Sequence, residues 1–224
     1  MLTKKGRPLI VGIVSSLEDL ESLRKFPLSH VDWCELRIDL LPGDFSELLP
    51  LVRQLKLPKI VTVRDPAEGG ANALSEESRS ELLQKWLPEC EAVDIEFKNL
   101  SRFSQLAFDA QSNGKEVIIS FHDFARTPPF AELIEVVEQS AIIPNRIFKA
   151  ATSVESWADL WSLIRLIEAC PGSRVAVMGM GSLGKLSRLV LARAGSYLSY
   201  GYLGDAVAHG QWSASRLHTL LAEI

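Results

Sequence analysis

The stretch Glu-Val-Ile-Ile-Ser-Phe-His at residues 116–122, followed by Arg-Ile-Phe-Lys-Ala-Ala at residues 146–151, decides the predicted fold. Both are short apolar runs bounded by polar residues, which is typical of buried strands. The first run ends in His122, and the second carries Lys149 in its interior. A lysine is almost never buried without a partner or a chemical role, so these two strands bear on both the architecture and the chemistry.

Apolar runs of the same kind recur along the whole chain. Predicted strands cover residues 9–14, 33–39, 59–64, 92–97, 116–122, 146–151, 174–180 and 196–201. Stretches with helical periodicity lie between them, and a last helix is expected at residues 213–224. Alternating strand–helix units of this number indicate a closed parallel barrel, so we expect an α/β fold, a single-domain (β/α)8 TIM barrel over residues 1–224.

Several predicted helices begin near residues that commonly cap helices. Ser75 opens a helical run, Thr127 precedes two prolines, and Thr152 stands three residues before Glu155. Hydroxyl side chains at such places accept hydrogen bonds from the first unpaired amides of a helix. We therefore expect Ser75, Thr127 and Thr152 to act as caps.

The composition fits one large core. Apolar residues make up 47% of the chain, and no linker or low-complexity run divides it. Three cysteines, Cys34, Cys90 and Cys170, lack metal-binding spacing. Cys34 alternates with Glu35 along its strand, so we expect a buried thiol that faces the helix layer.

Charge and hydropathy exclude several classes of partner. No apolar run approaches the roughly 20 residues that span a bilayer, and the N-terminus lacks a signal-peptide pattern, so we expect a soluble, cytoplasmic protein without membrane contact. A formal charge of −4 gives no electrostatic footprint for nucleic acid. An anionic small molecule would need a local cluster of arginines.

Such a cluster can be predicted from the strand ends, where barrel enzymes place their chemistry. Glu35, Arg37 and Asp39 share one strand face because they are spaced two apart, and they are expected to point inward near the barrel mouth. Arg64 ends the next strand, before a loop at residues 65–70 with the composition of an active-site turn.

Three further carboxylates have a simpler explanation. Asp94 and Glu96 lie two apart on the fourth strand, and Asp39 ends the second. Buried carboxylates commonly pair with neighbouring arginines. We expect Asp39, Asp94 and Glu96 to be such partners.

Lys149 is either a structural lysine paired with a carboxylate or an amine that forms an imine with a ketone. Burial and nearby guanidinium groups both disfavour an ammonium ion, and Arg37, Arg64 and Arg188 are the candidates for that effect. His122 lies one strand away and could act as the general base and acid beside such an imine.

A glycine run at residues 179–184 suggests a different function. It matches the G-x-G-x-x-G pattern of dinucleotide binding, follows a strand and has Asp205 about twenty residues later. A nicotinamide-dependent oxidoreductase is thus an alternative, although the run lies too late in the chain for a first βαβ unit. A phosphate loop is disfavoured because Leu186 replaces the hydroxyl residue that would bind magnesium.

Taken together, several segments resemble the type I 3-dehydroquinate dehydratases, lyases of the shikimate pathway and aromatic amino acid biosynthesis that use a Schiff base. The likeness covers nearly the whole chain, and it rests on the order and strand positions of the segments. They are Glu-Leu-Arg-Ile-Asp at 35–39, Thr-Val-Arg at 62–64, Glu-Gly-Gly at 68–70, Ser-Phe-His-Asp-Phe at 120–124, Thr-Pro at 127–128, Phe-Lys-Ala at 148–150, Met-Gly-Ser-Leu-Gly-Lys-Leu-Ser-Arg at 180–188 and Gly-Ser at 195–196.

The resemblance implies roles for the catalytic residues. Lys149 would form an imine with the C3 ketone of 3-dehydroquinate, and His122 would remove a C2 proton and protonate the leaving hydroxyl at C1. Glu68 would orient His122. The resemblance implies neither a metal nor an organic cofactor.

The resemblance also implies a set of substrate-binding residues. Arg188 would bind the substrate carboxylate, ring hydroxyls would be held by charged residues on the second and third strands, and Met180 would pack against the ring. A glutamine in the last strand–helix loop completes the set. The implied substrate-binding residues are Glu35, Arg37, Arg64, Met180, Arg188 and Gln211.

The chain departs from the family pattern in that last loop. The family commonly has Ser-Ala-Pro-Gly-Gln there, whereas this chain has Val-Ala-His-Gly-Gln at residues 207–211. Val207 lacks the hydroxyl expected at its place, and His209 removes the fixed φ of proline from a substrate-covering loop. We expect an effect on affinity and loop closure rather than on the core chemistry.

Other functions remain open at this point. A catalytically silent relative and a class I aldolase-like enzyme that uses Lys149 both fit the same barrel. The resemblance suggests a homodimer. Trp157 and Trp161, one helical turn apart, could mark its interface, but packing on the barrel is the favoured interpretation.

Overall fold

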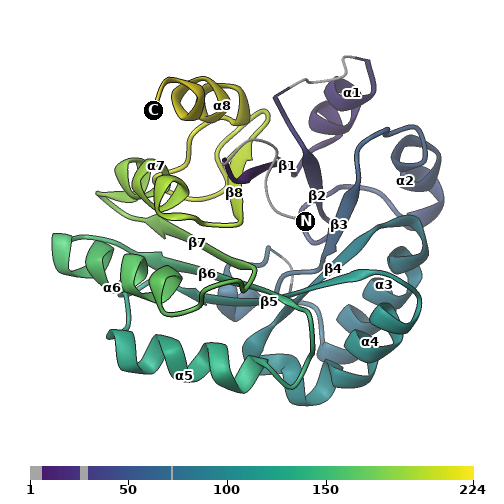
Figure 1. Ribbon diagram of the computed structural model, residues 1–224. Helices are drawn as coiled ribbons and strands as arrows, with labels where there is room; N and C mark the ends of the chain where they lie inside the picture. The colour runs from purple at the N-terminus through teal and green to yellow at the C-terminus, as the bar shows by residue number, and fades with distance from the viewer. Residues whose placement is uncertain (1–6, 26–29, 72) are drawn as a thin grey trace.

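The computed structural model describes residues 7–25, 30–71 and 73–224, and in these ranges parallel strands alternate with helices around a nearly closed barrel (Figure 1). The expected (β/α)8 fold is confirmed. The strands are β1 (Leu9–Val14), β2 (Trp33–Arg37), β3 (Lys59–Thr62), β4 (Ala92–Glu96), β5 (Glu116–Asp123), β6 (Ile147–Ser153), β7 (Val175–Met180) and β8 (Leu198–Tyr202). The α-helices are α1 (Leu17–Lys25), α2 (Phe45–Val52), α3 (Glu76–Trp86), α4 (Leu100–Ser112), α5 (Phe130–Ser140), α6 (Trp157–Glu168), α7 (Gly184–Ala194) and α8 (Ala214–Glu223).

The barrel closes at the seam between β7 and β8. Backbone ladders join β8 to β1 and run in sequence from β1 to β7. Across the remaining seam, the Tyr197 amide donates to the Val175 carbonyl at 2.8 Å. The Ser196 hydroxyl also accepts a hydrogen bond from the Val177 amide at 2.8 Å. The Ser196 side chain therefore replaces part of the backbone hydrogen bonding that joins the other neighbouring strands.

The register of β5 and β6 places the two reactive side chains on one face. Ser120 pairs with Lys149, and His122 pairs with Ala151. Because side chains alternate along a strand, His122 and Lys149 both point into the barrel, with His122 one step nearer the carboxyl end.

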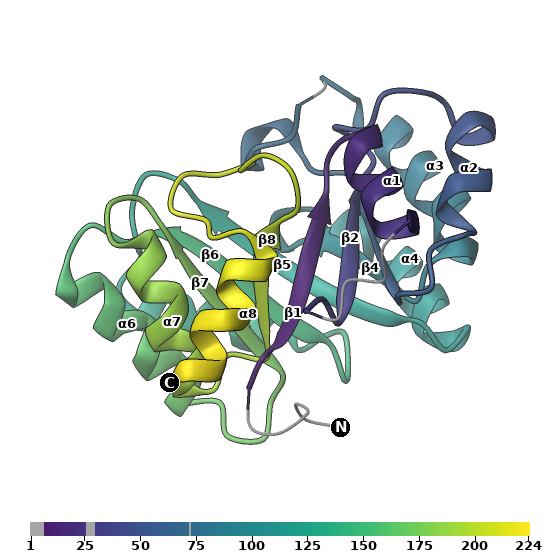
Figure 2. The same cartoon turned by 90° about the horizontal axis from the view of Figure 1, so that it is seen from above.

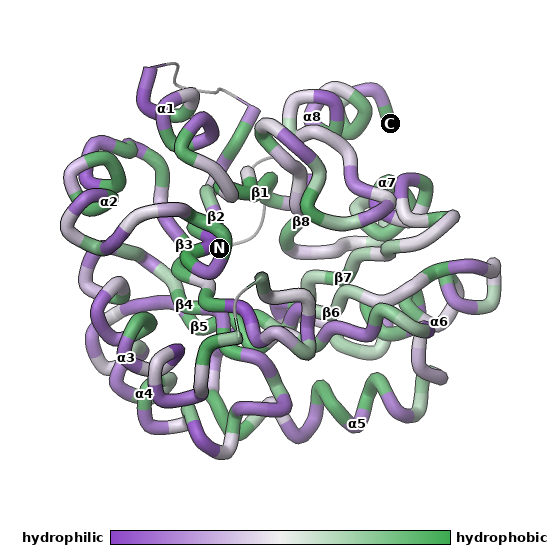
Figure 3. The backbone as a smooth tube through the Cα atoms, turned by 180° about the vertical axis from the view of Figure 1, so that it is seen from behind, coloured by the Kyte–Doolittle hydropathy of each residue, from purple (hydrophilic) through white to green (hydrophobic). Residues whose placement is uncertain are grey.

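The main apolar cluster lies between the strands and their covering helices. Figure 3 shows α5 alternating between hydrophobic and hydrophilic residues, as expected for a helix with one face on a sheet. Cys34 is fully buried in this outer layer, which confirms the expected orientation. Burial raises the pKa of its thiol to about 12, so Cys34 is an inert core residue.

Three strands, β2, β3 and β4, end earlier than the sequence predicts, and three, β5, β6 and β8, end later. β2 stops at Arg37 and β3 at Thr62. The next residues leave the ladders because the Asp39 carboxylate accepts hydrogen bonds from the amides of Arg64 and Ala71, each at 3.3 Å. β6 continues to Ser153 because β7 pairs with it that far.

One of the three expected caps is confirmed, and two are wrong. The Ser75 hydroxyl accepts a hydrogen bond from the Ser78 amide and caps α3. Thr127 instead donates to the Ser153 carbonyl at 2.6 Å, and Thr152 lies inside β6. Ser156 caps α6 in place of Thr152.

The tryptophans of α6 do not pack on the barrel. Trp157 and Trp161 are each 62% exposed, so the favoured interpretation of this pair is wrong. No helix in the described part of the chain is both long and apolar enough to cross a membrane.

The glycine run forms a tight turn between β7 and α7. Gly181 has a φ of +78°, in the region that favours glycine. A Cβ at Gly184 would lie 2.9 Å from the Cα of Gly210. The loops after β7 and β8 are thus in backbone contact, and Figure 2 shows the second loop, in yellow, extending beyond the strand ends.

Candidate active site

A cavity of about 110 Å³ opens at the carboxyl ends of the strands. Every site residue expected from the sequence lines it: Glu35, Arg37, Arg64, Glu68, His122, Lys149, Met180, Arg188 and Gln211. A larger hollow of about 600 Å³ lies between α3 and α4 and contains none of these residues.

Lys149 is held by carboxylates at the base of this cavity. It is 4% exposed, and its Nζ lies 2.8 Å from Asp94 Oδ2 and 3.4 Å from Glu35 Oε1. The ring of Tyr200 packs beneath, with its centroid 4.3 Å from Nζ. The site is therefore built to hold a positive charge at this nitrogen.

Asp94 connects the lysine to a second cation. Its Oδ1 lies 3.0 Å from Arg64 Nη1 and accepts a hydrogen bond from Ser120 at 2.6 Å. Burial opposes ionisation, but Arg64 and Lys149 together hold the pKa of Asp94 well below its usual range. We expected arginines around Lys149, but its direct ion pairs are with the carboxylates of Asp94 and Glu35.

The three carboxylates expected to pair with arginines do so. Asp39 forms a two-pronged contact with Arg37, with distances of 2.9 and 2.7 Å. Asp94 pairs with Arg64, and Glu96 accepts from Arg64 at 3.0 Å. Glu96 also contacts the buried guanidinium of Arg79, which reaches the sheet from α3.

His122 and Glu68 form a dyad above the lysine. His122 Nδ1 lies 2.7 Å from Glu68 Oε2. Burial, together with the charges of Arg64 and Lys149, holds the pKa of His122 well below 6.5, so the imidazole is neutral near pH 7. Burial also raises the pKa of Glu68 to about 7, although Arg64 opposes this effect.

The loop after β3 presents Glu68 to the cavity. A short 3₁₀ helix, η2 (Pro66–Glu68), carries the residue, and the Asp65 side chain caps it by accepting from the Ala67 amide. The Arg37 guanidinium donates to the Gly69 carbonyl at 3.1 Å. The carboxylate of Glu68 is thus fixed from both ends of its turn.

Arg188 differs from the other arginines of the site. It is 2% exposed, and its guanidinium donates to the carbonyls of Gly210 and Tyr200 at 3.1 and 2.9 Å. Among the residues that the structure describes, no carboxylate forms an ion pair with Arg188. Burial lowers its pKa to about 10. A buried cation without a counter-ion is a site for an anionic group.

The loop after β8 covers one side of the cavity. Gln211 Oε1 accepts hydrogen bonds from the amides of Val207 and Ala208, at 3.1 and 3.3 Å. Val207 and Ala208 line the cavity with apolar surface. Gln211 therefore shapes the loop, and Val207 places methyl groups where the resemblance implies a hydroxyl.

These groups together provide an amine, a neutral base and an anion-binding guanidinium. In the described ranges, no cluster of three or more His, Cys, Asp and Glu side chains could hold a metal ion. Residues 10–224 match the family model described as type I 3-dehydroquinase. The chain belongs to the type I 3-dehydroquinase family.

Individual members of the type I 3-dehydroquinase family align over most of the chain. A 3-dehydroquinate dehydratase of Methanococcus maripaludis (strain C5) is 35% identical over 213 residues, covering 93% of this chain and 95% of the relative. That of Methanocaldococcus jannaschii is 36% identical over 188 residues, covering 82% and 83%.

Solved structures show the same barrel. The 3-dehydroquinate dehydratase from Geobacillus kaustophilus has a TM-score of 0.87 at 23% identity, over 96% of this chain and 90% of that one. The enzyme from Enterococcus faecalis has a TM-score of 0.84 at 26% identity, over 100% and 96%.

Several apolar or aromatic cavity residues of this type I 3-dehydroquinase family member were not assigned from the sequence. Met178, Phe124 and Tyr200 line the cavity together with Met180. The period of two along β7 would have found Met178, since it shares a face with Met180. No local sequence pattern predicts a role for Tyr200, because β8 comes close to Lys149 only when the barrel is closed.

Proposed function

We propose that this chain is a 3-dehydroquinate dehydratase that eliminates water from 3-dehydroquinate through an imine on Lys149. One observation carries the proposal: a buried lysine, a neutral histidine and a guanidinium without a carboxylate partner among the described residues line one cavity. An amine, a base and an anion site are the groups that a carboxylated ketone needs for this elimination.

In the first step the Lys149 ammonium gives up a proton, and the free amine attacks the C3 carbonyl. The carbonyl oxygen leaves as water with that proton and a second proton from the nitrogen, which gives an iminium ion. The iminium carries the same positive charge as the ammonium that it replaces. Asp94 and Glu35 therefore stabilise it without rearrangement. The aromatic ring of Tyr200 also stabilises a positive charge at Nζ through a cation–π interaction.

The second step is proton transfer by His122. With its Nδ1 proton donated to Glu68, Nε2 of His122 is unprotonated and accepts a C2 proton, while the C–H electrons move into the iminium to form an enamine. The enamine expels the C1 hydroxyl, which leaves as water with the proton from His122. Hydrolysis of the imine then releases 3-dehydroshikimate and the amine.

The remaining cavity residues bind and orient the substrate in this proposal. Arg188 pairs with the carboxylate, and the ring hydroxyls face the charged side chains of the second and third strands. Met180 packs against the ring, and Gln211 holds the covering loop. No metal or organic cofactor takes part. The proposed substrate-binding residues are Glu35, Arg37, Arg64, Met180, Arg188 and Gln211.

Reductive trapping tests this function. Borohydride reduction in the presence of 3-dehydroquinate should add a stable substrate mass to the peptide that contains Lys149. The Lys149→Ala variant, once circular dichroism has established that it is folded, should give no adduct and lose nearly all activity. An adduct on another lysine, or turnover by Lys149→Ala within tenfold of the parent, would contradict the imine mechanism. An adduct without turnover would identify a silent relative.

The proposal extends to the organisation of the protein. We infer that the barrel is the single catalytic domain, that it works in the cytoplasm and that it forms a homodimer. The exposed pair Trp157 and Trp161 on α6 is the apolar surface that best suits such an interface. Sedimentation velocity of the purified chain tests the homodimer.

A further inference from the structure

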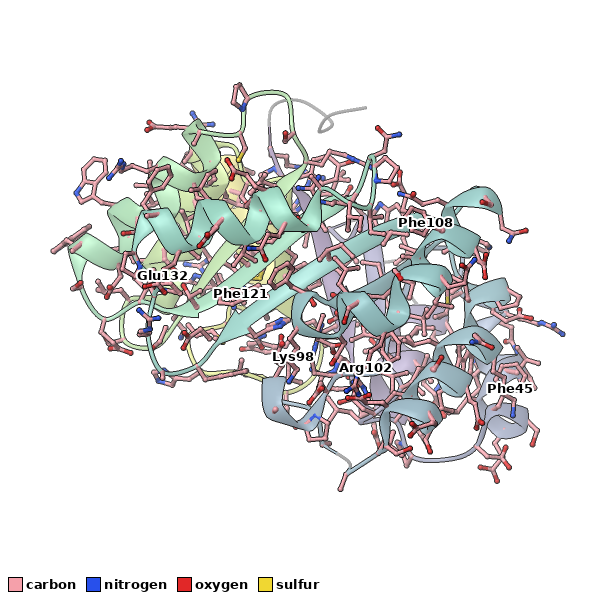
Figure 4. The ribbon with its side chains drawn as sticks, turned by 90° about the horizontal axis from the view of Figure 1, so that it is seen from below. Phe45, Lys98, Arg102, Phe108, Phe121 and Glu132 are labelled. Atoms are coloured by element: carbon pink, nitrogen blue, oxygen red, sulfur yellow. The ribbon has the colours of Figure 1, made fainter. Side chains whose placement is uncertain are left out.

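Lys98 lies just outside the cavity, after β4, in the short helix η4 (Phe97–Asn99). Its side chain is 38% exposed, and its Nζ lies 3.1 Å from Asp65 Oδ1 and 3.9 Å from Glu68 Oε1. In the view of Figure 4, Lys98 stands between Phe121 of β5 and Arg102 of α4. No role for this lysine was predicted from the sequence.

We propose that Lys98 is a positioning residue that keeps the Glu68 carboxylate ionised and aimed at His122, and thereby keeps His122 in the form that accepts a proton. The inference rests on the proposed function, in which His122 is the base. Lys98 acts through Glu68 and is not placed against the substrate.

The two oxygens of the Glu68 carboxylate face different partners. Oε2 faces His122 Nδ1 at 2.7 Å, and Oε1 faces Lys98 at 3.9 Å. Asp65 fixes the lysine, because its carboxylate also accepts from Arg79 at 3.1 Å and from Asn99 at 3.0 Å. The lysine is thus held in place by a residue three positions before Glu68 in the same loop.

Other charges around Glu68 are already engaged. Arg64 is bonded to Asp94 and Glu96, and these two carboxylates repel a charge on Glu68. Arg37 faces the loop but is paired with Asp39. In the described residues, the ion pairs of Glu68 are those with His122 and Lys98. The charged groups that face Glu68 are therefore Arg37, Arg64, Asp94, Glu96, Lys98 and His122.

The protonation state of Glu68 decides which nitrogen of His122 is available. An ionised Glu68 accepts the proton on Nδ1 and leaves Nε2 as the base. A protonated Glu68 donates to Nδ1 instead, which forces the proton onto Nε2 and removes the base, as happens when a triad carboxylate is replaced by an amide. Burial already raises the pKa of Glu68 to about 7, so a nearby cation has its largest effect near neutral pH.

The pH profile of kcat tests the inference. Removing the charge in Lys98→Met raises the pKa of Glu68, so the acidic limb of the profile should move to higher pH by about half a unit to one unit, allowing for partial exposure. At pH 6 the variant should be several-fold slower than the parent, and at pH 9 it should match the parent, with KM little changed. Lys98→Arg should restore the parent profile.

A matched control separates this effect from a general loss of charge. Lys25→Met removes a lysine from an exposed ion pair with Glu21 and should leave the profile unchanged. A loss of activity of equal size at every pH in Lys98→Met, or profiles that superpose, would overturn the inference. If Lys98 had a purely structural role, Lys98→Met would lose the same fraction of activity at every pH.

A second readout does not depend on turnover. ¹⁵N spectra of histidine-labelled protein report which ring nitrogen of His122 carries the proton, and the His122 signal is assigned by its absence in His122→Asn. As the pH falls, the Nδ1-protonated form should be replaced by the Nε2-protonated form. This change should occur at higher pH in Lys98→Met than in the parent. An unchanged transition overturns the role of Lys98. If the transition moves to higher pH in Lys98→Met but the parent forms no borohydride adduct, the role of Lys98 is supported and the proposed function is overturned instead.

Discussion

Lys149 is surrounded by opposite charge, and this changes what a substitution there does to the fold. A lysine with poor partners could be removed at little cost to the scaffold. Here its loss leaves Asp94 and Glu35 without one of their cations. Each has a second partner, Arg64 for Asp94 and the Thr62 hydroxyl for Glu35, so neither carboxylate is stranded. We therefore expect Lys149→Ala to fold, and the circular dichroism measurement in the trapping experiment tests this.

Val207 is where a single side chain should tune affinity. Val207→Ser or Val207→Thr places a hydroxyl on the cavity wall and should lower KM for 3-dehydroquinate about two- to tenfold, since a neutral hydrogen bond contributes roughly 0.5–1.5 kcal/mol. Turnover should change less than KM. Steady-state kinetics decide the matter, with Val207→Ala as the control that alters volume without adding a hydroxyl. An unchanged KM in both hydroxyl variants would refute this assignment.

At the scale of elements, the loops after β7 and β8 form one unit. Gly184 opens α7 against the backbone of Gly210, and Arg188, one turn later, donates to the Gly210 carbonyl. The same helix thus positions the Arg188 guanidinium and contacts the covering loop. We therefore expect closure of that loop and binding of a carboxylate to be coupled through these contacts.

Gly184→Ala tests this coupling. Its Cβ would lie 2.9 Å from the Gly210 Cα, too close to fit without a shift of the covering loop. We expect KM to rise several-fold and stability to fall by about 1–3 kcal/mol, as in other overpacked sites. Kinetics and thermal unfolding measure the two effects, and Leu186→Ala, an exposed change on the same helix, is the control. A variant with the parent's KM would show that the two loops are independent.

The elements also show how far the sequence alone could lead. Alternating apolar runs predicted the strands, and charges spaced two apart predicted which side chains point inward, because both follow from strand geometry. The cap predicted at Thr127 is wrong because its hydroxyl donates to the Ser153 carbonyl, which is distant in sequence. Arg79 was missed because an arginine on a helix is normally exposed, and only the assembled barrel brings Glu96 to it.

At the scale of the whole molecule, the side chain of Ser196 helps to close the barrel. Ser196 accepts from the Val177 amide, and its hydroxyl lies 3.1 Å from the Val177 carbonyl and 3.0 Å from that of Leu198. This seam is at the amino end of β8, away from the cavity at the carboxyl ends. Stability and catalysis are therefore separable there, as in other barrels, where the two ends serve different purposes.

Ser196→Ala should weaken the closed barrel without affecting its chemistry. The substitution leaves the buried Val177 amide without its 2.8 Å partner, which costs about 1–3 kcal/mol. For a chain of this length, the melting temperature should fall by about 3–10 °C, while kcat and KM at 25 °C stay within twofold of the parent. Ser162→Ala, which removes an exposed hydroxyl bonded to the Ala158 carbonyl, should shift the melting temperature by no more than about 1 °C. A Ser196→Ala protein as stable as the parent would mean that the other contacts across the seam suffice to close the barrel, whereas a loss of activity at full stability would place Ser196 in the catalytic machinery.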